Sequence, residues 1–139
     1  ADDSGLEVEA LDGKPGIFSA RFAGEGATSV EKCREHLSLL KEVPEEGRCA
    51  AFQCVVALAR RGKLIRTFQG SCRGRIASRI AGPGRFGFDP VFHYPPAGVT
   101  FAELGAGEKN RVSHRGRAVS GLLGFLSGEG KSFLEFRES

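Results

Sequence analysis

The sequence has 139 residues, enough for one domain with a buried core. Hydrophobic residues make up 40% and charged residues 27%, which excludes a disordered or fibrous composition. The net charge is only +3. No apolar run approaches the length that crosses a bilayer, so the composition is that of an ordinary globular domain.

The first predicted strand follows an acidic start. Leu6, Val8 and Ala10 alternate with glutamates, the period of a half-exposed strand, and the turn-forming residues 12–16 end it. Asp2 and Asp3 precede it and would make a metal-binding corner if they lay on a loop. Residues 17–22 can form a short extended or helical return.

A helix is predicted to follow, from about residue 28 until Pro44 stops it. Thr28 and Glu31 have the spacing of a capping box, in which each side chain bonds the backbone N–H of the other residue. The predicted apolar stripe of this helix consists of Val30, Cys33, Leu37 and Leu40.

The middle of the chain predicts antiparallel strands. Residues 49–60 and 64–69 flank a turn at Arg61 and Gly62 and predict a hairpin, and residues 71–80 predict a third strand. After the loop AGPGRFGFDPVF, Thr100 and Glu103 form a second capping box, and residues 113–126 carry apolar side chains at helical spacing. This order predicts a single α+β or α/β domain.

The four cysteines have no CxxC spacing and no histidines placed for zinc. Thiols without a disulfide framework are typical of a reducing compartment, so we expect a cytoplasmic protein. We interpret these residues as part of the core: Cys33, Cys49, Cys54 and Cys72.

The charges are unevenly placed, because no acidic residue lies between Glu46 and Asp89. Such asymmetry suggests an anionic partner, whereas a solvated sheet face is the alternative, since some of these arginines share one parity of a strand. We favour the solvated face for most of them and expect one or two to meet a polyphosphate. The basic residues of this stretch are Arg48, Arg60, Arg61, Lys63, Arg66, Arg73, Arg75, Arg79 and Arg85.

Three stretches carry residue types suited to catalysis or to binding a ligand. The opening DDS offers hard oxygen ligands, which suit Mg²⁺ together with substrate phosphates, although a solvated turn is the alternative. GRFGFDP presents rings beside glycines and would stack a base or end a core strand. EKNRVSHRGRA places cations at a helix start, where the helix dipole disfavours them unless an anionic or acceptor-rich ligand is present.

ADDSGLEVEALDGKPGIFSARFAG, FGFDPVF, TFAEL and EKNRVSHRGRA, in this order, closely resemble the inosine triphosphate pyrophosphatase family. The resemblance runs from residue 1 to about residue 126 and leaves residues 127–139 as an extra tail. It implies a two-lobed α/β fold around a long twisted mixed sheet flanked by helices, with the cleft between lobes, and a homodimer. It also implies Mg²⁺ and hydrolysis of ITP, dITP and XTP to the monophosphate and pyrophosphate.

The resemblance further implies roles for individual residues. Asp3 would bind the metal and act as general base, and Asp2 would be its acidic neighbour at the metal. Lys109 would contact the nucleotide, and His114 with Arg115 would read the base edge by donating to O6 of hypoxanthine or xanthine. The substrate-binding set as a whole is Ser4, Phe86, Gly87, Phe88, Asp89, Lys109, His114 and Arg115.

In that family a phosphate-binding loop and an acidic metal ligand precede the aspartate pair. The chain therefore resembles the C-terminal two-thirds of a family member, and we expect residues 1–139 alone to be catalytically inactive. Two alternatives stay open: a nucleotide-binding fragment without turnover, and an RNA- or nucleotide-binding module that uses the arginine-rich middle with Phe86 and Phe88. We expect no specific nucleic acid and no membrane as partners.

Overall fold

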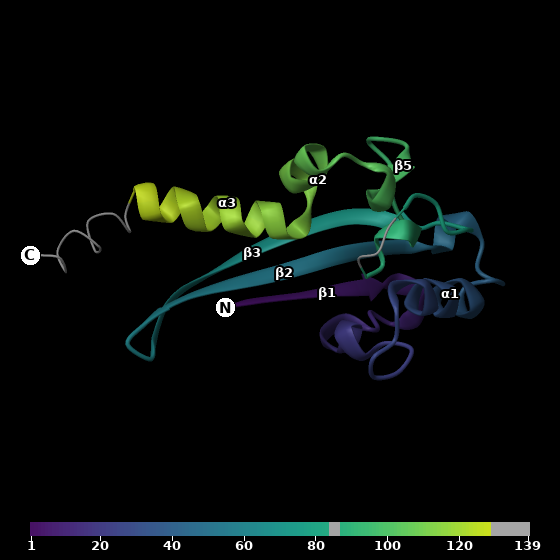
Figure 1. Ribbon diagram of the computed structural model, residues 1–139, viewed down its shortest axis with the longest axis horizontal. Coiled ribbons are helices and arrows are strands. Elements are labelled where there is room, and N and C mark those ends of the chain that lie inside the picture. The colour runs from purple at the N-terminus through teal and green to yellow at the C-terminus, as the bar shows by residue number, and fades with distance from the viewer. Residues whose placement is uncertain (84–86, 129–139) are drawn as a thin grey trace, which may run out of the picture.

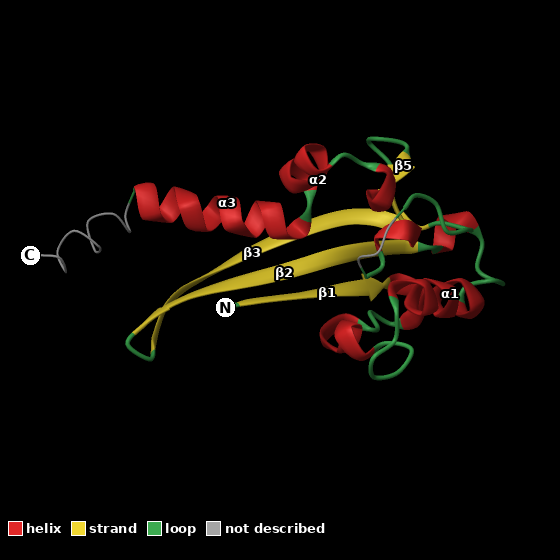
Figure 2. Cartoon of the chain, in the orientation of Figure 1, coloured by secondary structure: helices red, strands yellow, loops and turns green. Residues whose placement is uncertain are grey.

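One antiparallel sheet forms the spine of the molecule. The computed structural model describes residues 1–83 and 87–128. Figures 1 and 2 show long strands running side by side, with helices packed along them. In spatial order, which is also chain order, the strands are β1 (Asp2–Val8), β2 (Cys49–Arg60), β3 (Lys63–Ile76), β4 (Phe92–Tyr94) and β5 (Val99–Thr100).

The helices are α1 (Ser29–Leu39), α2 (Ala106–Val112) and α3 (His114–Ser127), joined by the short 3-10 turns η1 (Glu9–Leu11), η2 (Gly16–Arg21), η3 (Glu45–Gly47), η4 (Asp89–Val91) and η5 (Phe101–Glu103). In Figure 1, α3 lies along the β2–β3 ribbon and α1 lies near its other end. The predicted mixed α/β class is confirmed, and every strand pair in residues 1–83 and 87–128 is antiparallel. None of the described helices is long and apolar enough to cross a membrane.

Both predicted capping boxes are present. Thr28 and Glu31 cap the start of α1, and Thr100 and Glu103 cap η5. The predicted helix near the end of the chain is confirmed as α3, where the side chain of Ser113 accepts a bond from the backbone N–H of Gly116. These features rest on residues three positions apart, so local sequence is enough to specify them.

The sheet has two unlike faces because side chains alternate along each strand. On the first, called the covered face, Leu6, Phe52 and Cys72 lie in one row and are buried under helices and loops. On the second, called the open face, the row is Glu7, Ala51 and Arg73, and both charged side chains are exposed.

The predicted hairpin is confirmed, but the two strands expected after its turn form one continuous strand. β3 runs without a break from Lys63 to Ile76, although the sequence predicts separate strands on either side of Gly70, at residues 64–69 and 71–80. A side chain at Gly70 would meet the backbone of α3, with its Cβ 2.0 Å from the His114 carbonyl oxygen. Gly70 therefore stays in the strand and lets α3 approach, rather than ending the strand.

Two expectations about side chains were wrong. Cys49 is exposed on the open face, while Cys33, Cys54 and Cys72 are buried as expected, and all four are free thiols. Val30 is exposed rather than part of the apolar stripe of α1.

Arg48, one of the residues considered for an anionic partner, is 8% exposed. Its guanidinium donates to the carbonyl oxygens of Leu40 (2.7 Å), Val43 (3.1 Å) and Ala77 (3.1 Å). Because the planar guanidinium offers five N–H donors, one side chain ties the end of α1 to the chain beyond β3. Arg48 thus has a structural role.

Candidate functional site

The start of α3 is tied to the first strand by an ion pair. Arg115 Nε lies 2.9 Å from Asp2 Oδ2, and both side chains are partly exposed. Asp2 is on the covered face of β1, the same face as Ser4 and Leu6. The pair therefore brings residues from opposite ends of the chain to one place. The resemblance implies a metal role for Asp2 and a base-reading role for Arg115, and it does not imply this pairing.

A second ion pair lies nearby and joins α2 to η4. Lys109 Nζ donates to Asp89 Oδ2, and the carboxylate is almost buried. Burial raises the pKa of the Asp89 carboxyl, while the hydrogen bond and charge of Lys109 oppose that rise. The Arg115 charge also acts on Asp89, so the two ion pairs share one electrostatic neighbourhood.

His114 is the most constrained member of this group. Its ring stacks on Phe52, with centroids 4.6 Å apart and an interplanar angle of 13°. Burial is the main cause that lowers the pKa of His114 to about 4; the positive charges of Arg115 and Lys109 act in the same direction, and Asp2 opposes them. The imidazole is therefore neutral at pH 7, and its hydrogen-bond donation depends on its tautomer.

Two polar atoms at this place have no hydrogen-bond partner within the described residues. They are His114 Nδ1 and Ser4 Oγ, both buried. The carbonyl of His114 lies over Gly70, which pairs through Cys54 with Ser4, so the two residues flank the same row of the sheet. Buried polar atoms are nearly always bonded, so this arrangement suits a polar ligand that supplies the missing partners.

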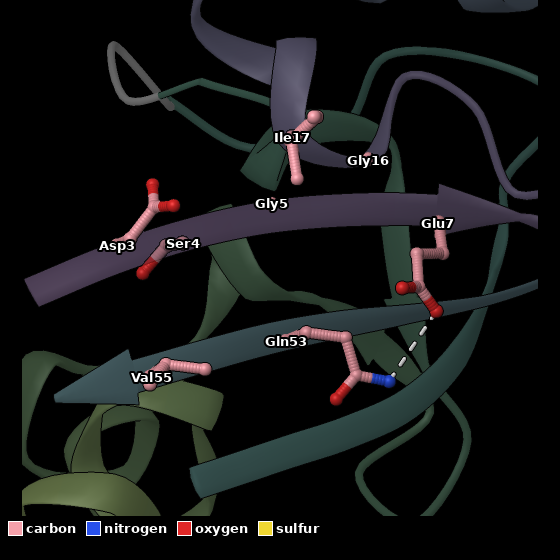
Figure 3. Close-up of a pocket in the computed structure, with 8 residues that line it drawn as sticks. All are labelled: Asp3, Ser4, Gly5, Glu7, Gly16, Ile17, Gln53 and Val55. Carbon is pink, nitrogen blue, oxygen red and sulfur yellow. Dashed lines mark hydrogen bonds between the residues drawn. The ribbon is translucent and has the colours of Figure 1, made fainter. Parts of the chain in front are cut away.

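Asp3 points away from this group. Asp3 and Ser4 leave β1 in opposite directions in Figure 3, as neighbours on a strand must. Asp3 lines a hollow of about 200 Å³ with Gly16 and Ile17 of η2. The expected loop corner is therefore wrong: the aspartates lie within a strand, and they do not face one another.

The metal prediction can be tested against these donors. Asp3 is an exposed carboxylate of the type that Mg²⁺ prefers, whereas Asp2 is held by Arg115. Within residues 1–83 and 87–128 there is no group of three or more His, Cys, Asp and Glu side chains placed to hold a metal ion. Mg²⁺ commonly uses one or two carboxylates together with substrate phosphates and water, so Asp3 fits as part of such a site.

The expected purine-lining segment is only partly visible. Phe86 lies outside the described residues. Phe88 is 4% exposed, and its ring meets Phe22 and His36 edge to face, at centroid distances of 5.7 and 4.8 Å. In this structure Phe88 is therefore a core ring, and Asp89 is the member of the segment that takes part in an ion pair.

Sequence reasoning missed His36 and Phe52. His36 is fully buried, and burial lowers its pKa to about 4. The signal was available, because His36 follows Cys33 at helical spacing on the same buried side of α1. Phe52 lay in a predicted strand, but nothing local indicates that its ring supports His114.

The fold is a mixed α/β domain that gathers two ion pairs and, within the part of the chain that the structure describes, two unpartnered polar atoms beside its sheet. Residues 1–125 match the sequence model of the Ham1 family. The chain belongs to the Ham1 family.

Relatives and solved structures agree with this assignment. The dITP/XTP pyrophosphatase of Desulforamulus reducens is 48% identical over 127 residues, which are 91% of this chain and 63% of that protein. The Staphylococcus aureus Ham1 protein superposes with a TM-score of 0.86 at 40% identity, over 93% of this chain and 66% of that one. A nucleoside-triphosphatase / dITP/XTP pyrophosphatase from Mycobacterium abscessus gives 0.74 at 42% identity, over 88% and 65%. The chain thus spans less than two thirds of the curated relative's length.

Proposed function

We propose that this chain carries the purine-recognition part of an enzyme that hydrolyses ITP, dITP and XTP to the monophosphate and pyrophosphate. The observation that carries the proposal is the pair of orphaned polar atoms, His114 Nδ1 and Ser4 Oγ, beside two ion pairs on one face of the sheet. Similarity to proteins named dITP/XTP pyrophosphatase supports the substrate class.

In this proposal the base is read by donors. The neutral His114 ring, in the tautomer with hydrogen on Nδ1, and the terminal N–H groups of Arg115 donate to O6 of hypoxanthine or xanthine. Adenine presents an amino group at that position and would leave these donors unpaired. Asp2 holds Arg115 through Nε, which orients the guanidinium for this role.

Hydrolysis would take place at the open face of β1, opposite to the face that carries His114. β1 is an edge strand of the described sheet, so a nucleotide that passes around this edge would reach both Ser4 on the covered face and Asp3 on the open face. Asp3 would accept the proton of a water that attacks the α-phosphorus, and pyrophosphate would leave as the bond from that phosphorus to the bridging oxygen breaks. Mg²⁺ bound at Asp3 and the phosphates would neutralise the charge that develops.

We further propose that residues 1–139 bind purine nucleotides but do not turn them over alone. One exposed carboxylate holds Mg²⁺ weakly, and the chain spans only 63% of its Desulforamulus relative. A cytoplasmic location, supported by the four free thiols, and a homodimer, implied by the resemblance, complete the proposal.

The test is pyrophosphate release from ITP and from ATP with excess Mg²⁺. From residues 1–139 we expect no pyrophosphate release above background. A second protein, called the joined protein, fuses this chain to the segment of the Desulforamulus relative that the chain does not match. We expect the joined protein to turn over ITP. Turnover by residues 1–139 alone would contradict the proposed division of the site.

Within the joined protein, Arg115→Ala should lower kcat/KM for ITP by on the order of 10²-fold or more. Arg111→Ala, which removes an exposed arginine from the neighbouring helix α2, is the matched control and should have little effect. An ITP-to-ATP preference that survives in Arg115→Ala would show that Arg115 does not read the base.

The RNA-binding alternative is less well supported. Arg48 is buried in carbonyl contacts, and Arg75 lies 3.0 Å from Glu45, so two of the basic residues have structural partners. Arg73 is exposed on the open face, opposite to His114. Salt-sensitive binding of a generic oligonucleotide, with no preference for ITP, would favour this alternative over the enzyme.

A further inference from the structure

One side of α1 contacts the segment expected to line the purine. Four residues at helical spacing make up this side, which we call the support stripe. Its members lie on one face of the helix, and each contacts Gly87 or Phe88. One of them, Lys32, also contacts the η2 segment. The four members are Ser29, Lys32, Cys33 and His36.

The support stripe holds the Gly87 carbonyl directly. Ser29 Oγ donates to Gly87 O at 2.5 Å, and Cys33 Sγ lies 3.6 Å from the same oxygen. Gly87 has a φ of 49°, in the left-handed region that glycine adopts without strain. The turn at Gly87 is therefore anchored by a hydrogen bond to a residue 58 positions earlier in the chain.

The same stripe sets the Phe88 ring. The His36 ring meets it edge to face at an interplanar angle of 89°, and Lys32 Nζ lies 5.9 Å from its centroid. Burial lowers the pKa of His36 to about 4, and the Lys32 backbone carbonyl opposes this, so the ring packs on Phe88 as a neutral imidazole. The His36 ring also lies 4.2 Å from the Phe22 ring centroid, so it packs between the two phenylalanines.

The next residue carries this constraint into the candidate site. Asp89 follows Phe88 directly and is the partner of Lys109. A shift of the Gly87 carbonyl would therefore move the Asp89 backbone and the ion pair with it.

We propose that Ser29 is a positioning residue for nucleotide binding: through the Gly87 carbonyl it fixes residues 87–89 without touching the nucleotide. This inference rests on the proposed function and on the purine-lining role that the resemblance implies for residues 87–89. The support stripe thereby makes α1 part of the recognition machinery.

The test measures the Kd of inosine 5′-monophosphate for residues 1–139, together with the thermal midpoint of each variant. Ser29→Ala should weaken binding about fivefold, as expected for one lost hydrogen bond. Ser29→Thr keeps the hydroxyl and should restore the wild-type Kd. Ser38→Ala makes the same change at an exposed position of α1 and should alter nothing.

A second readout separates positioning from stability. In the joined protein, Ser29→Ala should raise KM for ITP about fivefold and leave kcat unchanged, because the lost interaction acts on binding. A lower thermal midpoint with an unchanged Kd, or equal weakening by Ser38→Ala, would overturn the inference. If the wild-type chain bound no inosine monophosphate, the proposed function would fail, and the inference with it.

Discussion

Gly70→Ala should displace the candidate site although Gly70 does not belong to it. The new Cβ would lie 2.0 Å from the His114 carbonyl oxygen and 2.5 Å from the Ala118 backbone nitrogen. Both are backbone atoms of α3, so no side chain can turn away. To reach ordinary contact at 3.4 Å or more, the start of α3 would have to move off the sheet by more than an ångström.

The cost has two parts. Overpacking of this kind lowers the free energy of unfolding by about 1–3 kcal/mol. Misplacing a binding group by about 1 Å costs on the order of 10²-fold in turnover. His114 opens α3, so both effects follow from one methyl group.

Urea unfolding of residues 1–139 measures the first part, and kcat/KM for ITP in the joined protein measures the second. Gly124→Ala is the matched control, because it lies in the same helix and its new methyl group would have nothing within 4 Å. It should raise the free energy of unfolding by about 0.5–1 kcal/mol, since alanine favours helix. Wild-type stability and wild-type kcat/KM in Gly70→Ala would refute the reasoning.

Three further predictions concern charge. Arg48→Met should lower the free energy of unfolding by about 3 kcal/mol in a urea titration, because buried carbonyl groups lose a charged donor; a change below about 1 kcal/mol would contradict this. Burial lowers the pKa of His36 and of His114 to about 4, so the unfolded chain takes up protons first: stability is fully present above pH 6.5 and falls toward pH 4, by about 2 kcal/mol per histidine at pH 5. Equal free energies of unfolding at pH 7 and pH 5 would disprove this predicted pH dependence. Asp2→Asn should change stability by less than about 1 kcal/mol, because its pair with Arg115 is exposed, yet reduce the preference for ITP over ATP in pyrophosphate release; an unchanged preference would show that the pair does not orient Arg115.

The helix starts, the hairpin and the mixed α/β class could be predicted from the sequence. Thr28 with Glu31, and Thr100 with Glu103, specify their caps within four residues, and Arg61 with Gly62 turns the chain between β2 and β3. Such features depend on neighbours in sequence, so they survive whatever the rest of the chain does. The family motifs identified the same short stretches that the candidate site brings together.

Only the tertiary structure decided what several of these residues do. Glycine ordinarily weakens a strand, so the sequence predicts a break at Gly70. In the structure α3 packs so closely on Gly70 that only glycine fits there, and β3 continues through it. Asp2 and Asp3 read as one acidic pair, but strand geometry sends Asp2 to Arg115 and Asp3 to the opposite face. In both cases a contact comes from far along the chain: α3 packs on Gly70, and Arg115 pairs with Asp2. No local pattern in the sequence specifies which distant residue will lie against a given position.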